Sequence, residues 1–213
     1  MNSFPTVVRT KHVGIVEFTP ANQPHRFFDT WIEIEEVVHQ VFHLSKRLKD
    51  VEDLAIVPIL TGAGCFNTML GQKLNKQAPN KPVVEVPVVA RSYGAGTESG
   101  QLEIYAEWIQ RELIDDHNVV IIDDIYDTGK TANDVTELML EKFHPLSVQR
   151  AFLIRKRFDQ VAYDPSDYFL FDLPGICAES GKPLFFAGMG MDLNYRYRNL
   201  DRVIDVNSGR SSK

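Results

Sequence analysis

The stretch that decides the fold is VVIIDDIYDTGKTANDVTELMLEKF, residues 119–143. Its first part, Val119 to Asp123, is a short β-branched apolar run typical of a strand. Its last part, Thr131 to Phe143, carries apolar residues at helical spacing. In open α/β sheets, ligands bind where a loop leaves the carboxyl end of a strand. We therefore expect a binding site in the polar loop between these two elements.

The rest of the chain continues the alternation of strands and helices. Leu54 to Leu60 (LAIVPIL) is almost wholly apolar, as in a strand buried on both faces of a parallel sheet. A first helix is predicted from about Phe28 to Leu48. Further strands are predicted at Val83 to Ala90, Gln149 to Ile154, Asp167 to Leu173, Pro183 to Gly188 and Arg202 to Val206. This order predicts an α/β fold with a mainly parallel sheet flanked by helices.

Length and composition indicate one globular domain. The chain has 213 residues, of which 44% are hydrophobic, so we expect a single domain over residues 1–213 with a flexible tail at 208–213. The formal net charge of −6 argues against a nucleic-acid partner. Cys65 and Cys177 form no CxxC pair, and no apolar stretch is long enough to span a membrane. We expect a cytoplasmic protein with no membrane partner.

The loop of the deciding stretch combines carboxylates with a phosphate-binding geometry. Asp123 and Asp124 end the strand, and Asp127 begins a tight Thr-Gly turn before the helix. Backbone N–H groups from Thr128 through Gly129 and Lys130 to Thr131, together with the positive end of the helix dipole, suit a phosphate. Adjacent carboxylates suit ribose hydroxyls, directly or with Mg²⁺ nearby.

Two other interpretations of this loop are a nucleotide-binding P-loop and a purely structural turn. Gly129-Lys130-Thr131 resembles the end of a nucleotide-binding P-loop, but that motif needs glycine five positions before Gly129, where this chain has Asp124. Alternatively, the aspartates are solvated residues of a strand end and a turn, where Asp is common. Any one of them alone fits that interpretation, whereas the full run of strand, Asp-Asp and Asp-Thr-Gly-Lys-Thr is far more specific.

This run resembles the signature with which phosphoribosyltransferases bind phosphoribosyl pyrophosphate (PRPP). The likeness extends from about Leu54 to Val206 and is greatest to the hypoxanthine-guanine branch. The resemblance implies the type I phosphoribosyltransferase fold, with a small hood formed by the N-terminal and C-terminal segments. It also implies a homodimer or homotetramer.

The resemblance implies roles for two further loops. The family's Leu-Lys-Gly-Gly loop, which binds pyrophosphate through backbone amides, is replaced here by Leu60-Thr61-Gly62-Ala63. Thr61 and Gly62 are therefore the candidates for pyrophosphate contact, although the lysine and the second glycine are absent. Ser92 and Tyr93 resemble the start of the family's flexible loop, which closes over the reaction centre and excludes water.

The C-terminal third carries the residues that the family uses around the base. Lys156 in LIRKR stands where a lysine hydrogen-bonds the exocyclic oxygen of the purine, and Phe185 and Phe186 resemble the segment that stacks on the base. In GMGMDLNYRYRNL, residues 188–200, the match would make Asp192 a base-side residue that binds a second Mg²⁺, and Arg198 a pyrophosphate ligand. Residues 175–183 are longer than the family pattern and adjoin this edge, so they are expected to influence base preference.

The expected function is purine salvage by Mg²⁺-dependent transfer of phosphoribose from PRPP to hypoxanthine or guanine. Asp123 and Asp124 would hold the ribose hydroxyls and, with Asp192, serve as Mg²⁺ ligands. Asp127 would accept a proton from the base while Lys156 donates to its 6-oxygen. Alternatives are the same reaction on xanthine or another purine-like base, and a non-catalytic regulator that senses PRPP or a nucleotide.

Overall fold

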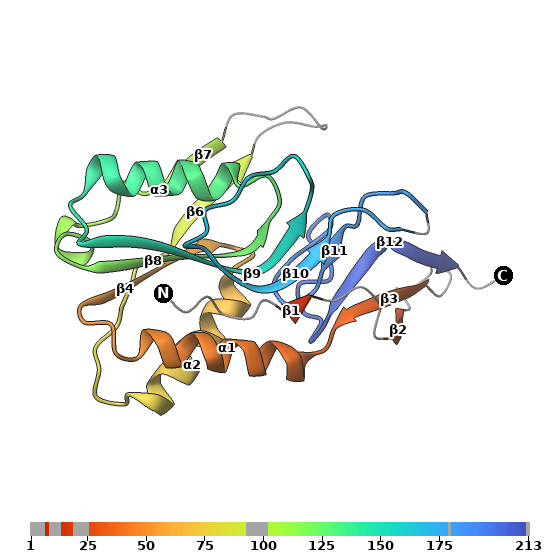
Figure 1. Cartoon of the computed structure of the whole chain (residues 1–213), viewed down its shortest axis with the longest axis horizontal. Coiled ribbons are helices and arrows are strands. Elements are labelled where there is room, and N and C mark those ends of the chain that lie inside the picture. Colours follow the sequence, from red (N-terminus) through yellow and green to blue (C-terminus); the bar gives the residue numbers. More distant parts are fainter. Residues whose placement is uncertain (1–6, 9–13, 19–25, 93–101, 179, 212–213) are drawn as a thin grey trace.

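The computed structural model describes residues 7–8, 14–18, 26–92, 102–178 and 180–211. Two β-sheets organise these residues (Figure 1). The larger sheet has helices on both faces, and the smaller sheet lies at one end of the molecule. The described part of the chain is therefore α/β, which confirms the predicted fold class.

The larger sheet has eight strands in the hydrogen-bonded order β1-β10-β9-β8-β4-β6-β7, with β5 paired to β4 outside this path. These strands are β1 (Val7–Val8), β4 (Leu54–Leu60), β5 (Val84–Glu85), β6 (Val88–Ser92), β7 (Leu102–Tyr105), β8 (Asn118–Tyr126), β9 (Ser147–Arg157) and β10 (Tyr168–Pro174). Every pairing is parallel except β6 with β7. The loops that follow β4, β8 and β9 therefore leave the same edge of the sheet.

The helices cover both faces of the larger sheet. The pair α1 (Ile34–Leu48) and α2 (Gly64–Gln77) lies on one face, and α3 (Lys130–Lys142) lies on the other (Figure 1). A short 3-10 helix, η1 (Arg111–Leu113), precedes β8. Ile56 and Ile122 belong to the core on the α1 and α2 side, whereas Val57 and Ile121 belong to the core on the α3 side. Burial on both faces is why β4 and β8 are nearly continuous apolar runs.

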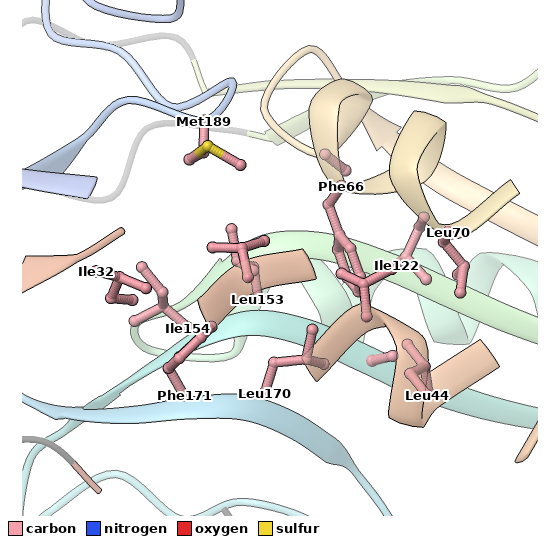
Figure 2. Close-up of a cluster of buried hydrophobic side chains, with 14 of the residues drawn as sticks. Ile32, Leu44, Phe66, Leu70, Ile122, Leu153, Ile154, Leu170, Phe171 and Met189 are labelled. Carbon is pink, nitrogen blue, oxygen red and sulfur yellow. The ribbon is translucent and has the colours of Figure 1, made fainter. Parts of the chain in front are cut away.

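Figure 2 shows the core between the sheet and its two-helix layer. Leu44 of α1 and Leu70 of α2 lie there with Ile122 of β8, and all are at most 1% exposed. Burying such a side chain completely contributes roughly 1.5–3 kcal/mol. Ile32 and Met189, from the region of the smaller sheet, belong to the same cluster. One continuous core therefore joins the two sheets.

The smaller sheet is assembled from both ends of the described chain. Its order is β11-β12-β3-β2, with antiparallel pairings throughout. The strands are β2 (Gly14–Phe18), β3 (Arg26–Ile32), β11 (Phe186–Ala187) and β12 (Val203–Ser211). This sheet corresponds to the small hood region that the sequence predicts.

The predicted start of the first helix at Phe28 is wrong, because residues up to Ile32 lie in β3. Phe28, Trp31 and Ile32 are all buried, so their spacing suits a helix as well as a strand. The helix begins at Ile34, where Glu33 and Glu36 form a capping box and the Glu33 N–H donates to the Glu36 carboxylate at 3.1 Å. This reciprocal capping fixes the boundary that periodicity misplaces.

Three other predicted boundaries change. The run Val83 to Ala90 is split into β5 and β6 around Pro87, which has no N–H for a ladder. In the strand predicted at Pro183 to Gly188, only Phe186 and Ala187 are in β11. The expected tail at 208–213 is partly a strand, since Arg210 and Ser211 pair with β3, and residues 212–213 lie outside the described part. In the described residues, no helix is long and apolar enough to cross a membrane.

Candidate active site

A cleft of about 800 Å³ opens at the carboxyl edge of the larger sheet. Its walls come from the ends of β4, β6 and β8, from the start of α3 and from the segment between β11 and β12. The lining includes seven residues that the sequence predicts for the site: Thr61, Gly62, Asp123, Asp124, Thr131, Asp192 and Arg198. The fold thus brings together residues from four separate stretches of the chain.

Asp123 and Asp124 place two adjacent carboxylates inside this cleft. Asp123 is 8% exposed, and the parallel register sets it opposite Phe152 of β9. Burial and the neighbouring Asp124 charge raise the pKa of Asp123 well above its usual range. Burial also raises the pKa of Asp124, against the lowering effect of its hydrogen bonds and of the Arg198 charge. The pair is therefore a concentrated negative site whose charge lacks full compensation within the protein.

The loop after β4 packs directly on this carboxylate pair. The peptide bond between Leu60 and Thr61 is cis, and Gly62 follows at the closest point. A Cβ atom at Gly62 would lie 1.9 Å from Oδ2 of Asp124. A Cβ atom at Gly190 would lie 2.3 Å from the Gly62 carbonyl oxygen. Two glycines thus let the loop, the acidic strand end and the C-terminal segment approach one another.

Asp127 and Lys156 form an ion pair beyond the acidic strand end. Lys156 Nζ donates to Asp127 Oδ2 at 2.8 Å. The lysine side chain is 9% exposed, whereas the aspartate is 48% exposed. Asp127 comes from the turn after β8 and Lys156 from the end of β9. A proton acceptor and a proton donor therefore lie side by side at the edge of the sheet.

The turn after Asp127 leads into the N-terminus of α3. Gly129 adopts φ +79°, and a Cβ there would lie 2.4 Å from the Tyr126 hydroxyl, so glycine is needed for both reasons. The first N–H groups of a helix have no partner within it. Thr128 and Lys130 are exposed at this point, and Lys130 Nζ pairs with Asp134 Oδ2 at 3.0 Å. A helix start of this kind can accept an anion through its backbone N–H groups.

The segment between β11 and β12 closes the cleft from the other side. Arg198 Nη2 lies 2.6 Å from Asp192 Oδ1, and Asp192 Oδ2 accepts a hydrogen bond from the Tyr195 N–H at 2.6 Å. Arg198 also donates to the Gly190 carbonyl. Both carboxylate oxygens of Asp192 therefore have partners within this segment.

The two predicted base-stacking residues have different environments. The Phe185 side chain is 41% exposed, whereas Phe186 is 2% exposed and makes an edge contact with Trp31 at 5.8 Å between ring centroids. Phe185 is thus available to a ligand, and Phe186 contributes its side chain to the core. Ser92 ends β6, and Tyr93, the other residue predicted for the flexible loop, lies outside the described residues.

The family model of the phosphoribosyl transferase domain matches residues 31–185. The chain belongs to the phosphoribosyltransferase family. The hypoxanthine-guanine phosphoribosyltransferase of Dictyostelium discoideum is 31% identical over 171 residues, which cover 78% of this chain and 88% of that protein. The hypoxanthine-guanine-xanthine phosphoribosyltransferase of Plasmodium falciparum is 28% identical over 188 residues, covering 84% and 76%. A structure of hypoxanthine phosphoribosyltransferase from Trypanosoma cruzi in complex with the product IMP is 25% identical, with a TM-score of 0.68 and coverage of 83% and 92%.

The described part of this phosphoribosyltransferase contains no group of three or more His, Cys, Asp or Glu side chains that could hold a metal ion alone. Asp123 and Asp124 nevertheless present carboxylate oxygens to the cleft, and their charge is only partly offset. Mg²⁺ prefers such oxygen ligands and takes others from water and substrate phosphates. These residues fit an ion that shares its coordination with substrate.

Several residues at or near the site of this phosphoribosyltransferase were not predicted from the sequence, among them Ile125, Tyr195 and Asp205. Ile125 and Tyr195 line the cleft, and Tyr195 is 93% exposed. Ile125 lies in the deciding stretch and Tyr195 in the C-terminal motif, so position within those motifs could have found them. Asp205, a buried carboxylate of β12, has no motif around it. Its connection to the site is seen only in the structure, where it accepts a hydrogen bond from the Phe185 N–H.

Proposed function

We propose that this phosphoribosyltransferase acts in purine salvage, transferring phosphoribose from PRPP to N9 of hypoxanthine or guanine and releasing pyrophosphate. The named relatives act on these bases according to their names, which supports the assignment. The single observation that carries it is the pairing of Asp127 with Lys156 beside the acidic strand end. A 6-oxopurine offers the complementary groups on one edge, an acceptor at its 6-oxygen and a proton at N7.

The base would be recognised and activated by this pair. Lys156 donates a hydrogen bond to the 6-oxygen, and Asp127 accepts the N7 proton as N9 attacks the ribose. Adenine carries an amino group in place of the 6-oxygen and would set a donor against the Lys156 ammonium. A site with a buried donor discriminates strongly against a ligand that leaves that donor unpaired.

The sugar would be held by the acidic strand end. Carboxylates at Asp123 and Asp124 accept hydrogen bonds from the ribose hydroxyls and stabilise positive charge that develops at the anomeric carbon. The backbone groups of Thr128, Gly129, Lys130 and Thr131 hold the 5′-phosphate at the helix start. Phe185 covers the base, with backbone groups of Phe186 beside it.

The pyrophosphate would lie between the loop after β4 and the C-terminal segment. Thr61 and Gly62 supply backbone amides, and Arg198 supplies positive charge. Asp123 and Asp124 would hold one Mg²⁺ and Asp192 a second, and the bound ions would neutralise charge on the leaving pyrophosphate. Ser92 and Tyr93 would belong to a loop that excludes water from the reacting carbon.

Two alternatives are tested against this function. The first is the same transfer with xanthine or another purine-like base as the preferred acceptor. The second is a non-catalytic sensor of PRPP or a nucleotide. Asp127 beside Lys156 favours catalysis, because a sensor needs no proton acceptor at the base.

The deciding experiment measures base consumption and pyrophosphate release with PRPP, Mg²⁺ and each of hypoxanthine, guanine, xanthine and adenine. We expect turnover with hypoxanthine or guanine and a kcat/KM for adenine at least about a hundredfold lower. PRPP binding without pyrophosphate release for any base would overturn the enzymatic function and leave the sensor. Preference for xanthine would select the first alternative.

The cellular location and the assembly of the protein are part of the same proposal. Cys65 and Cys177 lie far apart in the sequence and form no CxxC pair, which suits a reducing compartment, and we propose the cytoplasm. Chain length supports a single domain over residues 1–213, and the family resemblance supports a homodimer or homotetramer. Mass measurement in solution tests the assembly.

A further inference from the structure

A buried carboxylate lies behind the segment proposed to hold the base. Asp205 of β12 is 5% exposed. Its Oδ1 atom accepts hydrogen bonds from the backbone N–H groups of Phe185 and Asn207, each at 3.0 Å. Burying a carboxylate is costly unless it is hydrogen-bonded. The function described above makes no use of this residue.

The contacts of Asp205 fix the backbone of Phe185 from one side. The next residue, Val206, fixes it from the other, since its N–H donates to the Phe185 carbonyl at 2.8 Å. Both backbone polar groups of Phe185 are therefore bonded to β12, while the residue remains 41% exposed. The side chain of Phe185 therefore projects from a backbone whose position is fixed by hydrogen bonds.

Charge connects the same carboxylate to Lys156. Burial raises the pKa of Asp205, and its two backbone hydrogen bonds lower it. Asp29 raises this pKa further, and the positive charge of Lys156 lowers it. Lys156 is itself buried and ion-paired with Asp127. Asp205 is therefore bonded to the aromatic residue of the proposed base pocket and is within the electrostatic influence of its lysine.

Neighbouring contacts hold the strand in which Asp205 lies. The register between β12 and β3 shifts between Asp205 and Arg210. In this irregular stretch the Ser208 hydroxyl donates to the Asp205 carbonyl and accepts from the Asp29 N–H. Asn207 Nδ2 donates to the Pro183 carbonyl at 2.8 Å. The carboxylate thus projects from a stretch that is braced on both sides.

We propose that Asp205 is a positioning residue for base recognition, holding Phe185 through its backbone N–H so that the ring stays in place over the purine. This inference rests on the proposed function, in which Phe185 stacks on the base. Asp205 does not line the PRPP cleft. Its loss therefore acts on the base and leaves PRPP binding intact.

The test compares three variants of the full chain in steady-state assays with both substrates varied. Asp205→Val keeps the approximate size but removes the acceptor, whereas Asp205→Asn keeps an acceptor oxygen. Ser208→Ala is the matched control, because it removes hydrogen bonds of the same stretch without touching Phe185. We expect Asp205→Val to raise the KM for the base about tenfold, the usual order for an unsatisfied buried group, with the KM for PRPP within about threefold. Asp205→Asn and Ser208→Ala should keep both KM values within about threefold.

Equal changes in both KM values, or equal losses in all three variants, would overturn the positioning role and leave a general effect on stability. Hydrogen exchange of the Phe185 amide in the unchanged protein provides a test that needs no variant. Strong protection is expected, and exchange as fast as that of an exposed loop amide would refute the inference. If the unchanged protein turned over no purine, the proposed function would fail and this inference with it. A normal base KM in a folded, active Asp205→Val variant would refute only the inference.

Discussion

Lys156 Nζ lies 2.8 Å from Asp127 Oδ2, although the two residues are 29 positions apart in the chain. The parallel pairing of β8 with β9 brings them together, because Tyr126 pairs with Arg155 and the next residue of each chain segment is Asp127 or Lys156. Their pairing places a hydrogen-bond donor, Lys156, next to an acceptor, Asp127. Its consequence for catalysis can be tested directly.

Asp127→Asn keeps the size of the side chain and an oxygen that accepts from Lys156, but it cannot take up a proton. We expect kcat to fall by roughly 10²- to 10⁴-fold, the usual range for a positioned acid or base, with PRPP affinity within about tenfold. Asp134→Asn is the control, since Asp134 also pairs with a lysine but on the exposed face of α3. It should leave kcat within about twofold. A near-normal kcat for Asp127→Asn would return the residue to the role of a turn former.

Gly62→Ala should damage PRPP binding. Its Cβ would lie 1.9 Å from the Asp124 carboxylate, so either the loop or the ribose-binding side chain must move. We expect kcat/KM for PRPP to fall at least about tenfold, since ångström displacements at a site are costly. Gly71→Ala in α2 meets no atom within 4 Å and should keep activity while stabilising the helix by roughly 0.5–1 kcal/mol. Matching kinetics in the two variants would contradict the tight packing of Gly62.

Removal of divalent cations should abolish turnover. The carboxylates of Asp123 and Asp124 are proposed to share Mg²⁺ with substrate oxygens. Initial rates measured in excess chelator should fall to background and recover when Mg²⁺ exceeds the chelator. Full activity in the chelator would exclude a role for the ion in neutralising pyrophosphate.

Asp123→Asn should raise the thermal stability of the substrate-free protein at neutral pH. Burial raises the pKa of Asp123 above its usual value of 3.8. Between the usual pKa of 3.8, taken for the unfolded chain, and the raised pKa of the folded protein, the folded state binds more protons than the unfolded state. The free energy of unfolding therefore falls as pH rises through this window. Asn at position 123 does not titrate, so the variant does not lose stability through this group as pH rises. Tm measured from pH 4 to 8 in chelator should therefore decline less with pH than that of the unchanged protein. At this chain size each kcal/mol shifts Tm by roughly 2–4 °C. Parallel Tm curves for the two proteins would contradict the assignment.

Residues 175–183 should influence which base is preferred. A Cβ at Gly175 would lie 2.3 Å from the Phe158 ring, and Lys156 Nζ lies 5.5 Å from the centre of that ring. The stretch thus begins beside the proposed base donor. Cys177 and Lys182 are joined by a backbone hydrogen bond of 2.8 Å, so replacing residues 178–181 with Asn-Gly provides a standard two-residue hairpin turn. We expect the ratios of kcat/KM among hypoxanthine, guanine and xanthine to change. Unchanged ratios would make the stretch a surface extension.

Local patterns explain which parts of this fold could be predicted. The strand at Val119 to Asp123 and the helix after it were predicted within a few residues, because an apolar run, a turn and helical spacing are all contained in one stretch. The start of α1 was misplaced because the buried residues Phe28, Trp31 and Ile32 recur at helical spacing although they lie in β3. Residues 208–211 have no apolar pattern, and their strand is specified by backbone pairing with β3.

The same distinction applies to the candidate site. Asp123, Asp124 and Asp127 lie within one motif and were found together, whereas their partners come from distant segments. The packing of Gly62 on Asp124 and the reach of Asp205 to Phe185 depend on tertiary contacts that no spacing encodes. The family resemblance supplied Lys156 and Arg198, but not the residues that hold them in place.

The smaller sheet also determines how late in synthesis the fold can be completed. Asp29 of β3 bonds to Ser208, 179 residues later, so β3 remains an unpaired edge towards β12 until nearly the entire described chain has been made. The central strands can pair earlier, and α3 can pack on them, because these elements precede β12 in the chain. The hydrogen bonds to the Phe185 backbone form only once β12 has been made. Such distant pairing is slow to form because a long loop must close first. A chain that ends before β12 would contain the proposed ribose-phosphate loop but would lack the hydrogen bonds that hold Phe185 at the proposed base site. The edge of β3 would also remain exposed, and such an edge is prone to association.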